Sequence, residues 1–148
     1  MPQLIYALRF HGAAQRHGPD GNVLRITATA PGCAIHSEIG AEGLTGSIRP
    51  APGEATLESE LTFTGETTFQ EAGTIVFGPG EHRLRFSTMG SGYLDPLAPD
   101  TRRHGSAIRR VDGGDGQFAG ASGLITSLVF VSDDLSIDDH HLGVIFVP

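Results

Sequence analysis

Apolar and polar residues alternate along much of this 148-residue chain, as in strands that bury one face and expose the other. The clearest case is residues 55–69, ATLESELTFTGETTF, where most odd positions are apolar and the even positions carry Thr and Glu. At about 3.3 Å per residue one strand of this length would span roughly 50 Å, so we expect a bend or bulge near Gly65. The alternation places Leu57, Leu61 and Phe63 on the buried face.

Strand-like segments of this kind recur from one end of the chain to the other. They include residues 4–14, 23–30, 33–39, a short strand that ends in the proline-rich loop of GLTGSIRPAPG, 73–78, 82–90, 107–111, 123–132 and 140–148. Gly, Pro and Asp-Gly turns separate them, and no window has the period of a long amphipathic helix. The pattern predicts one all-β domain over residues 1–148, with eight or nine antiparallel strands closed into a barrel that leaves no sheet edge.

Composition and charge exclude several classes of function. The formal net charge is −7, so no basic surface is expected for a nucleic acid or an anionic membrane. All ten basic residues are Arg, and the absence of Lys excludes Schiff-base chemistry, lysine-bound pyridoxal phosphate and the Walker phosphate loop. Cys33 is the one cysteine, so no disulfide within the chain is expected. The N-terminal stretch lacks the basic region of a signal peptide, and we expect a soluble cytoplasmic protein.

Residues 111–127, VDGGDGQFAGASGLITS, hold five glycines, and the last of them precedes a β-branched run. Three interpretations compete: a phosphate-binding loop that opens a helix, a flexible linker, and a turn between two strands. The phosphate loop requires a helix after the glycines, whereas the residues that follow favour a strand. A linker would join domains, but both flanks are strand-like. We therefore predict a hairpin turn, with Gly120 and Gly123 at a corner of the barrel and no bound nucleotide.

The same stretch resembles the GG-x-G-x-F-x-G-x-x-G hairpin of allene oxide cyclases and, more loosely, of plant dirigent proteins. Residues 82–94, HRLRFSTMGSGYL, are similar to the cyclase segment before that hairpin, so the resemblance covers roughly residues 73–131. It implies a calycin-type barrel of about eight strands with an apolar interior, in a trimer, that works without a cofactor. The cyclase's catalytic carboxylate and cysteine lie toward its N-terminal half, where no motif of this chain aligns, so no catalytic residue is transferred.

The sequence does not predict a metal site. Residues 73–84, GTIVFGPGEHRL, resemble the second metal motif of cupins, with His82 as its ligand, but the spacing is one residue short and the first motif is absent. His140 and His141 are adjacent on a predicted strand, so they face opposite ways and cannot share one metal. A metal-dependent cupin-like enzyme therefore stays the third alternative.

Few polar residues are expected to reach the interior. Tyr6, Phe86 and His140 would line it beside Leu57, Leu61 and Phe63, with Tyr93 at a strand end as a hydrogen-bond donor to a substrate oxygen. His36 and Glu38 share one face of a predicted strand. They are either exposed or an inward acid–base pair, and we assign them the catalytic role together with Tyr93.

Two classes of function follow from this pattern. The first is a cofactor-independent isomerase or cyclase acting on a hydrophobic small molecule held in the barrel, and the second is a non-catalytic carrier or scaffold with the same ligand. Apolar segments at both ends of the chain predict a homo-oligomer, with a trimer ranked above a dimer through the resemblance.

Overall fold

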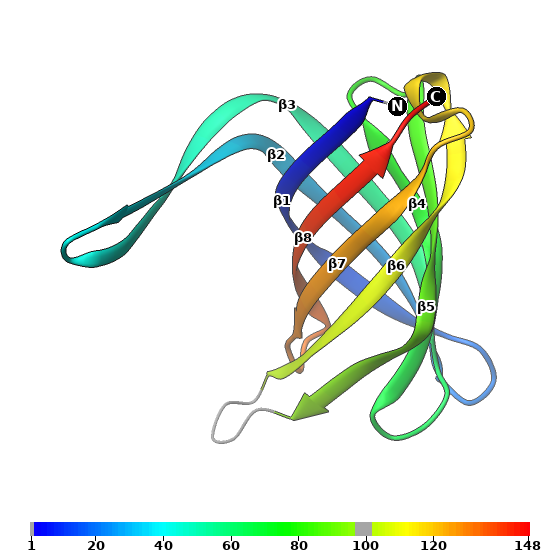
Figure 1. Cartoon of the computed structure of the whole chain (residues 1–148). Helices are drawn as coiled ribbons and strands as arrows, with labels where there is room; N and C mark the ends of the chain where they lie inside the picture. Colours follow the sequence, from blue (N-terminus) through cyan, green and yellow to red (C-terminus); the bar gives the residue numbers. More distant parts are fainter. Residues whose placement is uncertain (1, 97–101) are drawn as a thin grey trace.

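The structure is a computed structural model that describes residues 2–96 and 102–148. Eight antiparallel strands form a closed barrel in which each strand pairs with the next and the last returns to the first (Figure 1). The strands are β1 Gln3–His17, β2 Val23–Gly40, β3 Gly43–Phe63, β4 Thr68–Phe77, β5 His82–Pro96, β6 Arg103–Asp115, β7 Ser122–Val131 and β8 Ser136–Phe146. The prediction of a closed antiparallel barrel is confirmed.

The predicted alternation on β3 holds inside the barrel, but the strand ends earlier along the chain than expected. Leu57 and Leu61 point into the core and are 1% and 3% exposed, while the partly buried Phe63 packs against it. β3 ends at Phe63 and β4 begins at Thr68, so Gly65 lies in the turn between two strands. The prediction of one long bent strand over residues 55–69 is therefore wrong, because the chain reverses at TGET.

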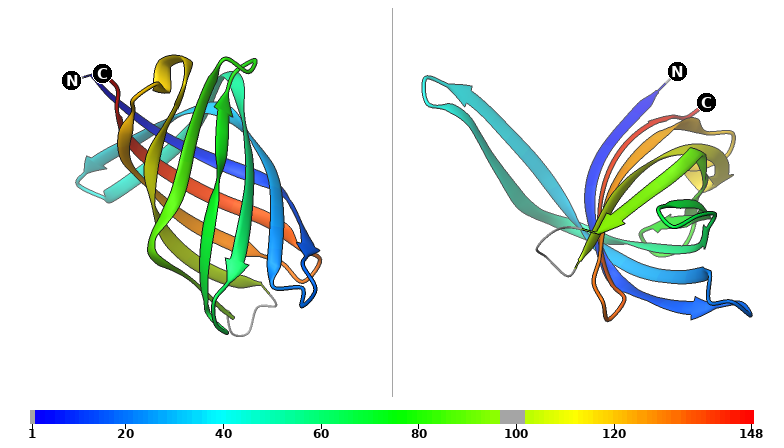
Figure 2. Two further views of the ribbon diagram at one scale, coloured as in Figure 1. Left: turned by 90° about the vertical axis from the view of Figure 1, so that its right-hand side faces the viewer. Right: turned by 90° about the horizontal axis from the view of Figure 1, so that it is seen from below.

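β2 and β3 extend beyond the barrel as a two-stranded arm, residues 31–54, which projects away from the other strands (Figures 1 and 2). The predicted proline-rich loop after residue 48 is wrong, because those residues remain in β3. The register shifts between Pro31 and Cys33, where the arm leaves the barrel. A side chain at Gly32 would place its Cβ 2.3 Å from the Pro52 carbonyl oxygen, so the two strands can pass this closely only at a glycine.

The glycine-rich stretch closes one end of the barrel. It holds a single 3₁₀ turn, Gly116–Phe118, between β6 and β7, and after the remaining glycines the chain enters β7 instead of an α-helix. Phe118 is 2% exposed, and its ring lies 5.2 Å from that of Phe77, which in turn lies 5.5 Å from Tyr6. The stretch thus supplies an aromatic plug. Across residues 2–96 and 102–148, no helix has the length and apolar character that a membrane crossing requires.

Candidate functional site

The interior of the barrel, the lumen, contains a cluster of ionisable side chains from three strands. Arg109 comes from β6, Glu71 from β4, and Asp139 and His141 from β8, and each is at most 4% exposed. They point inward because they occupy the same alternating positions as the buried apolar residues around them. These flanking residues are Phe69, Ile75, Ala107, Val111, Ile137 and Ile145.

Arg109 joins the members of this lumen cluster. Its Nη2 donates to Glu71 Oε1 at 2.6 Å and to Asp139 Oδ2 at 3.3 Å, and its Nη1 lies 2.6 Å from His141 Nε2. The guanidinium also lies 4.7 Å above the ring of Phe86. Each carboxylate also accepts a hydrogen bond from a serine hydroxyl. Ser59 donates to Glu71 Oε2 and Ser127 donates to Asp139 Oδ1, both at 2.5 Å. Each buried carboxylate therefore has a cationic partner and a hydroxyl donor.

Burial and the neighbouring charges set the protonation states of the cluster. For Asp139, burial opposes ionisation, but Arg109, His141 and Ser127 outweigh it and hold its pKa well below the ordinary range. For Arg109, burial alone would lower the pKa, but Glu71 and Asp139 raise it overall. Burial lowers the pKa of His141 in spite of Asp139. At neutral pH we therefore expect a cationic Arg109, an anionic Asp139 and a neutral His141.

The neutral ring of His141 can take either of two hydrogen-bonding arrangements. Its Nε2 faces both Arg109 Nη1 and, at 3.0 Å, Asp139 Oδ2. A ring protonated on Nδ1 accepts from Arg109, whereas a ring protonated on Nε2 donates to Asp139 and leaves a free lone pair on Nδ1. The second arrangement is that of a general base held by a carboxylate.

Three polar atoms of this region are buried without a hydrogen-bond partner: Tyr6 Oη, Arg109 Nε and His141 Nδ1. Burial raises the pKa of Tyr6, so its hydroxyl remains a donor at any physiological pH. Its ring lies across Gly143, where a Cβ would come within 2.2 Å of it. An unpaired buried polar atom costs about 1–3 kcal/mol, so three together indicate a place where the polar group of a ligand would bind.

Several of the predicted site residues lie in or beside the lumen. Tyr6, Leu57, Leu61 and Phe86 point into it, and Phe63 is partly buried against the core. Their role as ligand-binding residues stays a prediction.

The expectation that His36, Glu38, Tyr93 and His140 reach the lumen is wrong. His36 and Glu38 lie on the arm, where Nε2 and Oε1 are 2.9 Å apart and both side chains are more than half exposed. Tyr93 is 48% exposed, and its hydroxyl donates to Asp95 Oδ2 at 2.5 Å. His140 lies on the outer face of β8, because the inward positions of that strand are the odd ones.

The residues considered as metal ligands do not come together. His140 and His141 face opposite sides of β8, as predicted, and His82 Nδ1 accepts a hydrogen bond from the backbone N–H of Gln117 at 3.0 Å. Within residues 2–96 and 102–148, no group of three or more His, Cys, Asp or Glu side chains is arranged to hold a metal ion.

None of the four members of the lumen cluster was predicted as a site residue. A signal for each was present, since each lies at an even spacing from buried apolar residues of its own strand. In RR (109–110), DD (138–139) and HH (140–141), however, one member of each pair faces in and one faces out, and the choice depends on the strand register.

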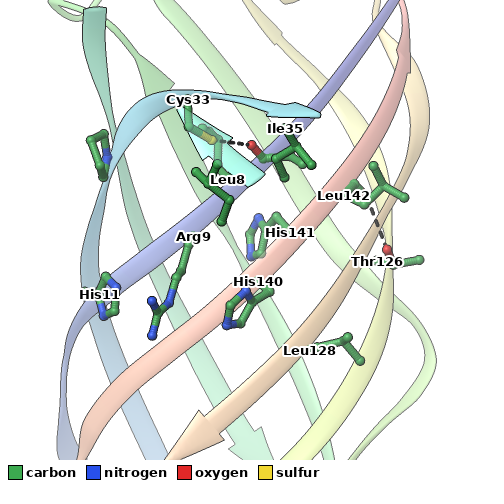
Figure 3. Close-up of a pocket in the computed structure, with 13 residues that line it drawn as sticks. Leu8, Arg9, His11, Cys33, Ile35, Thr126, Leu128, His140, His141 and Leu142 are labelled. Atoms are coloured by element: carbon green, nitrogen blue, oxygen red, sulfur yellow. Dashed lines mark hydrogen bonds between the residues drawn. The ribbon is translucent and has the colours of Figure 1, made fainter. Parts of the chain in front are cut away.

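A groove of about 470 Å³ lies outside the barrel, between the base of the arm and strands β1, β7 and β8 (Figure 3). Ile35 and Ile48 of the arm and Leu128 and Leu142 of the barrel form apolar walls. Arg9, His11 and His140 lie together at one side of it. Arg9 binds Asp138 through two hydrogen bonds of 2.9 and 2.7 Å. His141 is also a lining residue of this outer groove, while its ring contacts Arg109 and Asp139 inside the barrel (Figure 3).

Comparisons with known proteins give one structural similarity. No family model and no curated protein matches the sequence. Among solved structures, the pterocarpan synthase dirigent protein is similar, with 13% sequence identity and a TM-score of 0.47 over 98% of this chain and 86% of that one. Dirigent proteins are one of the two families that residues 73–131 resemble.

Proposed function

We propose that the lumen binds a small, mainly apolar molecule that carries a carbonyl or hydroxyl oxygen, and that the chain isomerises or cyclises this molecule by acid–base chemistry. The observation that carries the proposal is the set of buried, unpartnered polar atoms on Tyr6, Arg109 and His141. Arg109 and His141 belong to the lumen cluster, in which one histidine is neutral beside a carboxylate. Such a combination inside an apolar enclosure is typical of catalytic sites.

The apolar part of the substrate would contact the buried side chains that surround the cluster. Phe10 packs against His141 with ring centroids 4.7 Å apart, and Phe86 lies beneath Arg109. These rings exclude water, which strengthens every hydrogen bond made to the cluster. The lumen would thus hold the substrate in one conformation, and this restriction itself lowers the barrier to ring closure or isomerisation.

The acid–base step would use His141. When Nε2–H of His141 donates a hydrogen bond to Asp139, Nδ1 carries a lone pair. This lone pair can accept a proton from a carbon next to the substrate carbonyl. Tyr6 Oη–H and Arg109 Nε–H are the donors available for the negative charge that then develops on the substrate oxygen. Return of the proton to another carbon completes an isomerisation in which no atom is gained or lost.

Extraction and turnover together test this proposal. The full chain is purified, extracted with organic solvent, and the extract analysed by mass spectrometry. Any recovered compound is then incubated with the wild-type protein, with His141→Gln and with His140→Gln, which replaces the neighbouring histidine on the outer face. We expect conversion to a product of unchanged mass by wild type and His140→Gln, and a loss of at least about 100-fold for His141→Gln.

A carrier is the second candidate, and the largely apolar lining of the lumen favours it. A compound that binds equally to the wild type, His141→Gln and His140→Gln, and that is recovered unchanged, would identify the chain as a carrier. A wild-type protein that carries no organic compound and is not stabilised by any of a panel of apolar ketones and phenols would overturn both candidates.

A further inference from the structure

The two sides of the barrel's outer surface differ in chemistry. Outward positions of β2–β4 are polar, with Arg25 bonded to Glu60 at 3.0 Å and Thr27 paired with Glu58. Part of the outer surface of β5–β8 and β1 instead carries aliphatic side chains that are 47–66% exposed, which we call the outer belt. It consists of Ile5, Met89, Ile108, Leu124, Leu128 and Leu142.

The outer belt is continuous across the strands. Met89 pairs with Ile108, Ile108 with Thr126, and Thr126 with Leu142, which together form one row around the barrel. A second row joins Leu124, Val144 and Ile5. At about 4.8 Å between strands and 3.3 Å per residue, the belt covers roughly 400 Å². Large contiguous apolar patches on a soluble protein mark contact sites.

The arm has an apolar face of the same kind. Ile35 pairs with Ile48, and Ile39 pairs with Leu44, so all four side chains emerge on one side. They are 54%, 65%, 86% and 73% exposed in that order. The opposite face of the arm carries His36, Glu38, Thr45, Ser47 and Arg49.

The arm is poorly suited to stand free in water. An isolated two-stranded hairpin is marginally stable at best, and this one leaves four aliphatic side chains uncovered. Figures 1 and 2 show that it projects away from its own barrel, so its outer half has no surface of its own chain to cover it. Ile39 and Leu44 are therefore an exposed apolar surface of the kind that a partner covers.

We infer that a second copy of this chain covers the arm: the apolar face of the arm of one copy lies on the outer belt of the next. At the same spacings the apolar face of the arm covers roughly 200 Å², and with the belt about 600 Å² per chain, which approaches the roughly 800 Å² per partner of a stable interface. The four aliphatic residues of the arm and both rows of the belt bear no charge, so no ion is buried unpaired. A lipid surface fits less well, because Glu38 and Glu42 lie near the tip of the arm.

The arm and the belt are different surfaces. Each copy therefore places its arm on the belt of one neighbour, and its own belt contacts the arm of another copy. Such a contact closes into a symmetric assembly when the rotation between copies divides a full turn. The outer groove between barrel and arm would then be filled by the neighbouring chain, because its walls are formed by parts of both surfaces.

Sedimentation of the full-length chain at low micromolar concentration tests the inference. We expect an oligomer for the wild type and a monomer for Ile39→Glu/Leu44→Glu. Leu128→Glu places a charge on the outer belt, which is the surface that receives the arm, and should also give a monomer. The matched control, Thr45→Glu/Ser47→Glu, adds the same charge to the polar face of the arm and should remain an oligomer. Far-UV circular dichroism checks that each variant keeps its strands.

Cross-linking identifies the surfaces that meet. In a Cys33→Ser background, one chain carries Ile39→Cys and a ¹⁵N-labelled chain carries Leu142→Cys, and the mixture is treated with a flexible bis-maleimide. The expected product joins one labelled and one unlabelled chain. A monomeric wild type, an oligomer that survives Ile39→Glu/Leu44→Glu, loss of the oligomer in the control variant, or the absence of the mixed product would each overturn the inference.

Discussion

Two histidine–carboxylate pairs of this chain have the same spacing and opposite surroundings. His141 and Asp139 are two residues apart on β8 with their atoms at 3.0 Å, and His36 and Glu38 are two residues apart on β2 with theirs at 2.9 Å. The first pair is buried in the lumen beside Arg109, and the second faces solvent on the arm. Contact geometry is therefore a poor guide to function. Burial and the third partner distinguish a candidate site from a surface pair worth well under about 1 kcal/mol.

The largest effect is expected from removal of the cation that holds the buried pair. Arg109→Met leaves Glu71 and Asp139 without their cationic partner in the lumen, which should lower the free energy of unfolding by about 3–5 kcal/mol. Arg110→Met is the matched control on the outer face and should change it by about 0.5 kcal/mol or less. Urea unfolding measures both. Equal effects of the two substitutions would contradict the assignment of Arg109 as the centre of the cluster.

Neutralising the carboxylate should change stability for the buried His141–Asp139 pair and leave it nearly unchanged for the exposed His36–Glu38 pair. Asp139→Asn keeps the side-chain shape but weakens the bonds from Arg109 and Ser127, so we expect a loss of about 2 kcal/mol. Glu38→Gln should stay within about 0.5 kcal/mol of the wild type, because water replaces its partner. Urea unfolding at neutral pH reads the difference, and a larger loss for Glu38→Gln would refute the comparison.

The pH dependence of stability reports on His141. Burial lowers its pKa in the folded state, so as the pH falls below about 6.5 the unfolded chain binds this proton first and stability decreases, by up to about 1.4 kcal/mol per pH unit. His141→Gln should remove this part of the slope, and His36→Gln should keep it. The lowered pKa of Asp139 acts at lower pH, because its contribution is lost only as the pH falls below about 3.9. Unfolding curves between pH 5 and 8 make the measurement.

The smallest effect on stability is expected at the two tyrosines. Tyr6→Phe removes a buried hydroxyl that has no partner, so stability should be unchanged or higher by up to about 1 kcal/mol, while ligand binding is lost. Tyr93→Phe removes an exposed bond to Asp95 and should leave both stability and binding unchanged. Thermal unfolding with and without the extracted compound tests this. Retained binding in Tyr6→Phe would remove Tyr6 from the site.

The sequence predicted the barrel well because alternation on β3 and the turn residues between strands are local signals. It failed on β8 for a physical reason. Leu142, Val144 and Phe146 suggested an inward face that includes His140, but these residues belong to the outer surface. A strand that is apolar on both faces has no alternation from which to read its register, and on β8 both the core and the outer belt require apolar residues.

The arm could not be predicted for a related reason. Residues 33–39 alternate in the same way whether the strand lines a barrel or leaves it, so His36 and Glu38 were equally compatible with both positions. What separates the cases is the pairing of β2 with β3 beyond Pro31, where neither strand has a second neighbour. That is a property of the sheet and is absent from the local sequence.

The pairing of β1 with β8 has a consequence for folding. This seam joins residues 3–13 to residues 136–146, so it closes the longest loop in the molecule and is expected to form last, after the neighbouring hairpins. Until then Tyr6 lies on one open edge of the sheet, Asp139 and His141 lie beyond the gap, and the charges of Arg109 and Glu71 stay hydrated. Dehydration of the cluster and completion of the fold are then a single event, and a nascent chain holds no assembled site until β8 has been synthesised.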